Sequence, residues 1–295
     1  MDLHDYVAEE IATDCADGLI SRREALRRLG LIGLGTVSAG AVLAACSGGD
    51  DTAGKRSGTS RPASTSTSTT TRTGGSVHVE SITISDRQAV FAAAAEPKGA
   101  VLLVHEIFGL TDHFRSLTGR LAADGYSAIT VDLVPSGTGT VGDQGKIIGI
   151  LTGSPEDRLL GDLRLGLDEL ERRAPGVKLG VMGFCFGGGL TWRLLAAGEP
   201  RVAVAVPFYG PAPDTPDFSR SRAAVLAIYG ALDDRVNATR DAAVSALRNA
   251  GLTYEVRTFP GADHAFFNDT GARYNATAAA DAYRAVLDWF SRYLG

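Results

Sequence analysis

The sequence predicts one α/β domain, a mostly parallel central sheet with helices on both faces, preceded by a long N-terminal extension. From residue 77 onward, short apolar runs of strand length alternate with amphipathic segments of helical spacing. Such an order requires right-handed crossovers between parallel strands, and these place helices on both faces of the sheet. The chain has 295 residues, of which 44% are hydrophobic, enough for a large buried core.

The expected elements follow one another in a regular order. Residues 77–84 and 88–94 alternate apolar and polar side chains, as paired edge strands do. Further strands, several of them continuously apolar, are expected at residues 100–104, 127–133, 177–184, 202–208, 223–229 and 253–259. Helices are expected at residues 113–125, 157–173, 189–197, 237–251 and 275–294, with Asn237 opening its helix. Ligands of such sheets bind at the carboxyl ends of strands, so reactive residues should follow strands.

The first 46 residues have the composition of an export signal. Arg22 and Arg23 precede residues 29–45, an uncharged run that is short for a membrane span but suits the apolar region of a signal. The arginine pair resembles a twin-arginine signal, although Ala25 stands where a bulky apolar residue is usual. The acidic lead before the pair is also unusually long.

Residues 43–46, Leu-Ala-Ala-Cys, resemble a bacterial lipobox, which predicts acylation of Cys46. The alternative is a chance cluster of small residues at the end of an uncleaved anchor helix. Residues 47–75 are mostly Ser, Thr and Gly and are expected to form a disordered linker. The protein is therefore expected to be exported and held at the outer face of the cytoplasmic membrane, with the lipid at Cys46 as its only membrane contact.

Charge and cysteine spacing exclude several classes of partner. The net charge is −5 and no basic stripe occurs, which argues against nucleic acid. The three cysteines, Cys15, Cys46 and Cys185, are far apart and match no zinc-ligand spacing. Neither a metal nor an organic cofactor is expected, and the domain is expected to be a monomer.

Residues 183–189, Gly-Phe-Cys-Phe-Gly-Gly-Gly, lie between an expected strand and an expected helix. The pattern matches a nucleophile elbow, with Cys185 in the position usually held by serine. Glycines are needed there because side chains would collide with the adjoining strand and helix. Glycine-rich turns also bind phosphate, but no Gly-Lys-Ser/Thr follows, which excludes a P-loop. The N-terminus of the following helix would favour a thiolate and an oxyanion.

A nucleophilic thiol requires a base and an acid that orients it, and in this architecture the chain order is nucleophile, acid, base. Of the five histidines, only His264 follows Cys185, in a turn after the last expected strand. Either Asp233 or Asp234 could be the acid, and Asp233 is favoured because it lies three residues after Gly230. Backbone N–H groups of Phe186 and Ile107 are the candidates for the oxyanion hole.

Residues 105–109, His-Glu-Ile-Phe-Gly, together with Asp132, the cysteine elbow, Asp233 and His264, resemble the dienelactone hydrolase family of the α/β-hydrolase superfamily. The resemblance covers about residues 76–295. It implies hydrolysis of lactones or small esters by a Cys–His–Asp triad. It also implies a role for Glu106, a carboxylate that contacts the resting thiol and helps to generate the thiolate.

The chain departs from that family in its charges. The family holds the carboxylate of its substrate with arginines, one of them about a turn beyond the base, but residues 265–268 carry no cation. The glycine-rich loop 135–156 contributes only Lys146 as a cation. A broader carboxylesterase or lactonase is therefore expected. Acyl transfer on the same triad, or a non-catalytic surface lipoprotein that retains the fold, are the alternatives.

Overall fold

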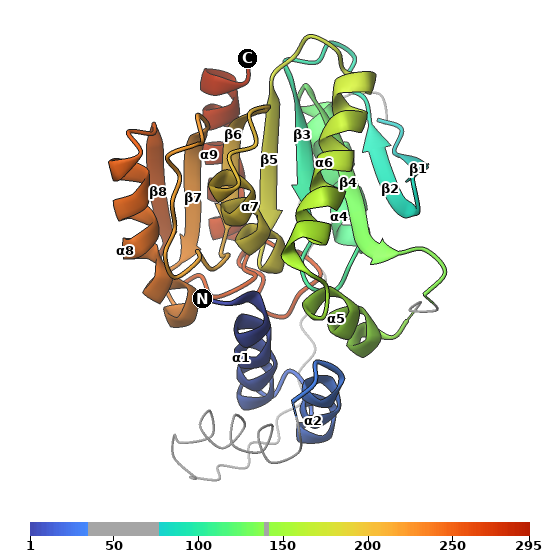
Figure 1. The fold of residues 1–295 in the computed structure, drawn as a ribbon, viewed down its shortest axis with the longest axis vertical. Coiled ribbons are helices and arrows are strands. Elements are labelled where there is room, and N and C mark those ends of the chain that lie inside the picture. The colour runs from blue at the N-terminus through green and yellow to red at the C-terminus, as the bar shows by residue number, and fades with distance from the viewer. Residues whose placement is uncertain (35–76, 139–141) are drawn as a thin grey trace, which may run out of the picture.

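The computed structural model describes residues 1–34, 77–138 and 142–295. Its centre is an eight-stranded sheet in the order β1-β2-β4-β3-β5-β6-β7-β8 (Figure 1). The strands are β1 (Glu80–Ile84), β2 (Arg87–Ala92), β3 (Gly99–Val104), β4 (Tyr126–Pro135), β5 (Leu179–Phe184), β6 (Val202–Phe208), β7 (Ala224–Gly230) and β8 (Tyr254–Phe259). Strands β3 to β8 pair in parallel, whereas β1 and β2, at one edge, pair antiparallel with each other and β2 pairs antiparallel with β4. The predicted α/β fold is confirmed.

Helices cover both faces of this sheet. In Figure 1, α6 and α7 lie in front of the sheet, and α4 and α9 lie behind it. These helices, with α5 and α8, have the bounds α4 (Asp112–Ala123), α5 (Gln144–Thr152), α6 (Glu156–Arg173), α7 (Phe186–Ala196), α8 (Asp234–Asn249) and α9 (Ala276–Tyr293). In α6 the leucines at 159, 163, 167 and 170 recur every three or four residues and are buried. The amphipathic pattern therefore faces the sheet as expected.

One loop and two helix starts differ from expectation. The glycine-rich loop predicted at residues 135–156 contains helix α5, Gln144–Thr152. Helix α7 begins at Phe186, directly after the elbow, rather than at residue 189. Helix α8 begins at Asp234, so the prediction that Asn237 opens it is wrong. The cause is Asp233, whose carboxylate accepts the backbone N–H of Val236 at 3.3 Å and caps the helix one turn earlier. Asn237 instead donates its side-chain amide to the carbonyl oxygen of Gly230 at 2.9 Å.

The N-terminal segment forms two helices that sequence patterns do not predict, α1 (Leu3–Ala16) and α2 (Arg22–Leu31). Both lie against the edge of the domain formed by the carboxyl ends of the strands, next to α5 (Figure 1). Helix α1 buries Tyr6, Val7 and Ile11 almost completely. Burial of a large apolar side chain contributes about 1.5–3 kcal/mol. Helix α1 is therefore part of the hydrophobic core of the described structure.

The predictions of a lipid-modified cysteine and a linker concern residues that the structure does not describe. Cys46 and the predicted linker, residues 47–75, lie outside the described residues. Within the part of the chain that the structure describes, every helix is too short or too polar to cross a membrane.

The elbow between β5 and α7 is strained and tightly packed. Cys185 has φ 54° and ψ −119°, a conformation that L-residues rarely adopt. A Cβ atom on Gly183 would lie 2.1 Å from the carbonyl oxygen of Gly187, and one on Gly187 would lie 2.3 Å from that of Val104. The turn can form only because these two positions lack side chains.

We predict that Gly187→Ala lowers the free energy of unfolding by about 3 kcal/mol, because its Cβ would displace the backbone at the end of β3. The matched control is Gly161→Ala in α6, where nothing lies within 4 Å of the new Cβ. This control should raise stability by about 0.5–1 kcal/mol through helix propensity. Urea unfolding measures both, and equal effects of the two substitutions would contradict the packing described.

Candidate active site

The elbow places Cys185 at the carboxyl end of β5, next to the loop that follows β3. Its backbone N–H donates to the carbonyl oxygen of Phe208 at 3.0 Å, and its own carbonyl oxygen accepts from Gly189 at 3.0 Å. The side chain is only 4% exposed. These bonds hold the thiol at the sheet edge, between the ends of β5 and β6.

The structure brings His264 and Asp233 together. His264 lies in the turn after β8, and its Nδ1 is 2.6 Å from Oδ2 of Asp233, which follows β7. Burial alone would raise the pKa of Asp233, but the charge of His264 and its hydrogen bond outweigh burial and hold that pKa below its ordinary value. Asp234 is exposed at the surface. The favoured aspartate of the two is therefore the one in contact with the histidine.

Tyr6 of α1 lies between the histidine and the thiol. Its phenol donates to Sγ of Cys185 at 3.2 Å, and the same oxygen is 3.1 Å from Nε2 of His264. The ring is fully buried. Burial, assisted by the nearby charges of Cys185 and Glu10, raises the pKa of Tyr6 well above 10.0, so the phenol keeps its proton. No sequence motif marked this residue, because its role in the site arises only from the packing of α1.

Two arginines, Arg235 and Arg273, and the carboxylate of Glu10 lie beside His264 and Tyr6. Oε2 of Glu10 lies 3.7 Å from Nε2 of His264, and the same carboxylate forms an ion pair with Arg235. Arg273 lies 3.7 Å from the other carboxylate oxygen of Glu10. Residues 265–268 carry no cation, but Arg235 in the first turn of α8 and Arg273 in the loop before α9 bring positive charge to the same place. Their approach could not be read from their distance along the chain.

The pKa of His264 reflects these neighbours. Burial lowers it, because the interior disfavours a charged imidazole, but the negative charges of Glu10, Asp233 and Cys185 act in the opposite direction. The hydrogen bond to Asp233 adds to them, and the pKa of His264 is raised well above its ordinary value. His264 therefore holds its proton more tightly with α1 in place than an exposed histidine would.

Glu106 is buried beside the site but does not hydrogen-bond to the thiol. Its Oε2 accepts the side-chain amide of Asn268 at 2.7 Å, and its Oε1 accepts the hydroxyl of Tyr209 at 3.3 Å. Burial raises the pKa of Glu106, although these two hydrogen bonds oppose the shift. The expected contact between Glu106 and Cys185 is thus not a hydrogen bond in this structure, where Tyr6 holds the thiol.

The loop after β3 is held in place by His105. Its Nε2 accepts the backbone N–H of Leu133 at 2.9 Å, so Nδ1 carries the proton and donates to the carbonyl oxygen of Glu106 at 2.6 Å. Burial lowers the pKa of His105, consistent with this neutral form. Ile107, which follows Glu106, is buried. Phe186 begins α7 directly after the nucleophile. Both expected oxyanion donors therefore belong to segments that meet at the elbow.

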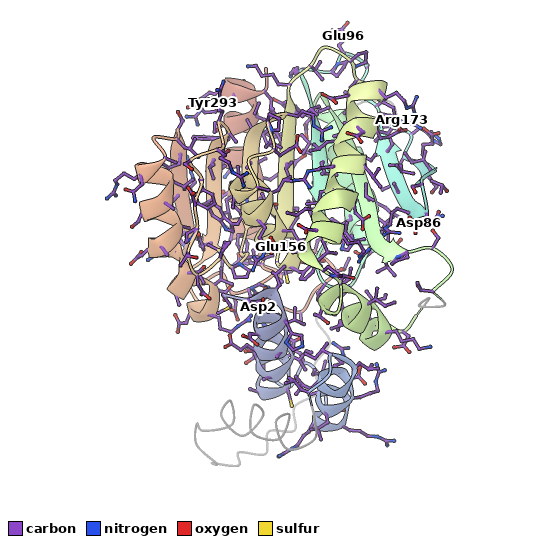
Figure 2. All side chains as sticks on the ribbon, in the orientation of Figure 1. Asp2, Asp86, Glu96, Glu156, Arg173 and Tyr293 are labelled. Carbon is purple, nitrogen blue, oxygen red and sulfur yellow. The ribbon has the colours of Figure 1, made fainter. Side chains whose placement is uncertain are left out.

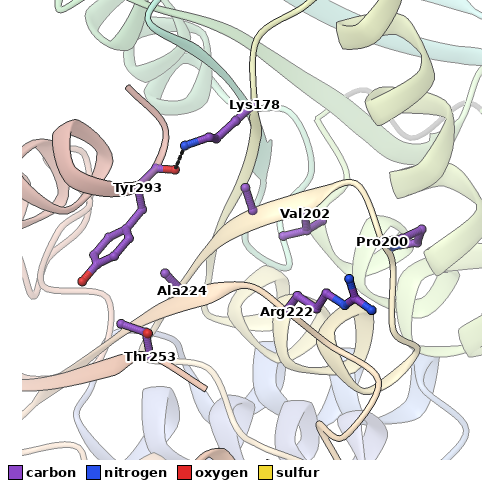
Figure 3. Close-up of a pocket in the computed structure, with 8 residues that line it drawn as sticks. Lys178, Pro200, Val202, Arg222, Ala224, Thr253 and Tyr293 are labelled. Carbon is purple, nitrogen blue, oxygen red and sulfur yellow. Dashed lines mark hydrogen bonds between the residues drawn. The ribbon is translucent and has the colours of Figure 1, made fainter. Parts of the chain in front are cut away.

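A small crevice remains beside α1. It has a volume of about 100 Å³ and is lined by residues of α1, α5 and α6, with Phe186 and Arg193 of α7. In Figure 2, the labelled residues Asp2 and Glu156 mark its α1 and α6 walls. A second, larger groove, lined by Lys178, Arg222 and Tyr293 among others, contains none of Cys185, Asp233 and His264 (Figure 3). The crevice reaches the residue next to the nucleophile but does not include the thiol.

Comparison with known proteins identifies a family whose matched region includes these residues. The model of the dienelactone hydrolase family matches residues 88–294, which include the elbow, Asp233 and His264. The chain belongs to the dienelactone hydrolase family. The hydrolase fold and the family resemblance expected from the sequence are thereby confirmed, and helices α1 and α2 lie outside the matched region.

Relatives and solved structures agree with this assignment. A protein of Escherichia coli O157:H7 named "Putative carboxymethylenebutenolidase" is 34% identical over 215 residues, which is 68% of this chain and 79% of that protein. One of the same name from Saccharolobus solfataricus is 29% identical over 242 residues, 70% of this chain and 93% of its own. The crystal structure described as a "Putative Dienelactone Hydrolase" from Klebsiella pneumoniae is 31% identical, with a TM-score of 0.64, covering 74% of this chain and 99% of that one.

The raised pKa of His264 makes stability depend on pH. A group whose pKa is raised on folding stabilises the folded state fully below its unfolded value, near 6.5, and that stabilisation is lost as the pH rises through the folded pKa. We predict that Glu10→Gln shifts this loss to lower pH, because it removes one of the charges that raise the pKa of His264. Calorimetric Tm values across the pH range measure the shift. Glu9→Gln, at an exposed neighbouring position, is the control, and coincident profiles for all three proteins would contradict the prediction.

Proposed function

We propose that this protein hydrolyses ester or lactone bonds of small molecules through a covalent thioester on Cys185, with His264 and Asp233 as base and orienting acid. One observation supports this most directly. A single oxygen atom, that of the Tyr6 phenol, lies 3.2 Å from Sγ and 3.1 Å from Nε2 of His264. In acyl transfer, the carbonyl carbon of the substrate must contact the nucleophile while the leaving oxygen contacts the base. The position of the phenol oxygen is within reach of both groups.

The proposed reaction has two halves. In the first, the thiolate of Cys185 attacks the carbonyl carbon, and the N–H groups of Ile107 and Phe186 hold the oxyanion. Nε2 of His264 then donates its proton to the leaving oxygen, the carbon–oxygen bond breaks, and an alcohol leaves a thioester behind. In the second half, His264 accepts a proton from water, the hydroxide attacks the thioester, and the carbon–sulfur bond breaks, which releases the acid product and regenerates the Cys185 thiolate beside protonated His264. Asp233 keeps the imidazole oriented throughout.

Glu106 is proposed to help form the thiolate. Its carboxylate is buried, and burial raises its pKa toward the range in which it can accept a proton from a thiol. In this structure the carboxylate accepts hydrogen bonds from Asn268 at 2.7 Å and from Tyr209 at 3.3 Å, while the thiol is bound to Tyr6.

The proposal is tested with p-nitrophenyl esters, lactones and a dienelactone on the full-length chain. Cys185→Ala should abolish turnover, and Cys185→Ser should retain only a small part of it. Asp233→Asn should lower kcat by about 10⁴-fold, because the imidazole would then take the wrong tautomer. The matched control, Asp234→Asn at an exposed position, should leave kcat within about twofold of the parent, as is usual for a surface substitution.

Hydrolysis that persists in Cys185→Ala would reject the mechanism. Product analysis with an added alcohol separates hydrolysis from acyl transfer, since transfer would form a new ester in place of the free acid. Absence of turnover with every substrate, in the parent chain and also in Tyr6→Ala, where the phenol no longer covers the thiol, would favour a non-catalytic protein that retains the fold.

We also propose that residues 1–46 direct export and that Cys46 is lipidated, which would hold the domain at the outer face of the cytoplasmic membrane. The support comes from the composition of residues 21–46. In the folded chain, Arg22 and Arg23 begin α2 and are both exposed, with Ser21 as the helix cap. An export receptor could therefore reach the arginine pair without unfolding the domain.

Lipidation predicts that cells labelled with radioactive palmitate incorporate it into the protein and that Cys46→Ala abolishes incorporation. Cys15→Ala is the control, because that cysteine lies in α1 and should not affect labelling. Label that survives Cys46→Ala would exclude this site of acylation.

A further inference from the structure

Helix α1 covers the active site at the point where a substrate would bind. A carbonyl carbon must come within about 3–3.5 Å of the attacking sulfur. The phenol oxygen of Tyr6 already lies 3.2 Å from Sγ, and the side chain is fully buried there. An acyl group and Tyr6 cannot occupy this position together. Tyr6 must leave before the reaction proposed above can begin.

We propose that residues 3–16, helix α1, are an intramolecular plug that binds the mouth of the active site and keeps the enzyme inactive until the helix is displaced. The proposal rests on the function proposed above, since it regulates that same site. It assigns to the site mouth a partner of defined chemistry, an acidic amphipathic helix that is part of this chain.

Charge complementarity supports this assignment. The acidic side of α1 presents Glu10 and Asp14, both buried, to two arginines of the domain. Glu10 pairs with Arg235, whose guanidinium also lies 4.9 Å from the centre of the Tyr6 ring. Asp14 pairs with Arg273 at 2.8 Å. While the helix is bound, the two carboxylates neutralise both arginines. Departure of the helix would break these ion pairs.

Further contacts hold the start of α1 in position. Arg235 donates to the carbonyl oxygen of Tyr6 at 3.1 Å, and Arg193 donates to that of Met1 at 2.8 Å. Apolar packing adds to these bonds, because a methyl carbon of Leu3 would lie only 2.8 Å from a Cβ at Gly189 in α7. The plug therefore contacts the helix that follows the nucleophile as well as the loop that carries the acid.

Helix α2 extends the same attachment toward α5. Arg27 pairs with Asp143 at 3.3 Å, and Arg28 donates to the side chain of Gln144 at 2.9 Å. A Cβ at Gly149 would lie 2.9 Å from the carbonyl oxygen of Leu31, which shows how closely the two helices approach. The N-terminal segment is therefore seated over several elements around the site mouth.

Two observations favour a plug over a catalytic role for α1. The family match begins at residue 88, so α1 lies outside the matched region, which contains Cys185, Asp233 and His264. In addition, Nε2 of His264 faces Tyr6 at 3.1 Å and Glu10 at 3.7 Å, whereas the proposed reaction requires it to face the leaving oxygen. If a peptidase cut the chain directly before Cys46, α1 would depart with the leader.

The test uses the full-length chain with Cys15→Ala and Cys46→Ala, which leaves Cys185 as the sole thiol. Glu10→Arg sets a positive charge against Arg235 and should displace the helix. Glu9→Arg makes the same charge change at an exposed position of α1 and is the matched control. The readouts are the rate of alkylation of Cys185 by iodoacetamide and the initial rate of p-nitrophenyl acetate hydrolysis.

We expect Glu10→Arg to raise both rates by about tenfold or more, because unpairing a buried ion pair shifts an equilibrium by at least that order. Glu9→Arg should leave both rates within about twofold of the parent, as an exposed substitution does. Tyr6→Ala, which removes the group between Sγ and Nε2, is a second variant and should also raise both rates. Circular dichroism identifies any variant that fails to fold, and the remaining variant then decides.

Alkylation rates that remain equal in Glu10→Arg, Tyr6→Ala and Glu9→Arg would overturn the plug. Faster alkylation with slower hydrolysis would also overturn it, because α1 would then belong to the working site. Faster alkylation with no hydrolysis in any protein would support a plug over Cys185 and reject the proposed ester hydrolysis, so failures of the two proposals are distinguishable.

Discussion

The close approach of the elbow to the end of β3 is the constraint on which the site depends. Cys185 adopts φ 54° only because Gly183 and Gly187 leave room for backbone within 2.1–2.3 Å of where their Cβ atoms would lie. That approach sets the N-terminus of α7 against the loop carrying Glu106 and Ile107. The strain of one residue is stabilised by a sheet whose parallel strands are buried on both faces. The same contact places the start of the loop that carries Ile107 beside the elbow.

Electrostatics around His264 connect the domain with the N-terminal helix. Asp233 serves two structural purposes, since one carboxylate oxygen caps α8 and the other contacts the histidine. Glu10 adds a carboxylate from α1 to the other side of the ring, and Arg235 balances it. The charge state of the imidazole is therefore coupled to the position of α1. Departure of the helix would remove the charge of Glu10 from beside the imidazole.

The N-terminal segment gives one stretch of sequence two proposed uses. Arg22 and Arg23 stay exposed on α2, while Tyr6 and Glu10 of α1 are buried against the domain. An export signal must be accessible to its receptor, whereas a plug must be buried against the domain. The two proposed functions therefore depend on different surfaces of the same pair of helices. A protein exported in its folded state would then travel with its thiol covered.

The sequence by itself determined the fold, the elbow and the order of the proposed catalytic residues, because strand periodicity and glycine spacing are local properties of the chain. It also favoured Asp233 over Asp234, and the structure places Asp233 against His264. Only the tertiary structure decided that Tyr6, Glu10, Arg235 and Arg273 meet at the site. The approach of α1 to the domain joins residues more than 170 positions apart, such as Tyr6 and Cys185. Contacts over such distances depend on packing and charge pairing between elements, which no local pattern in the chain records.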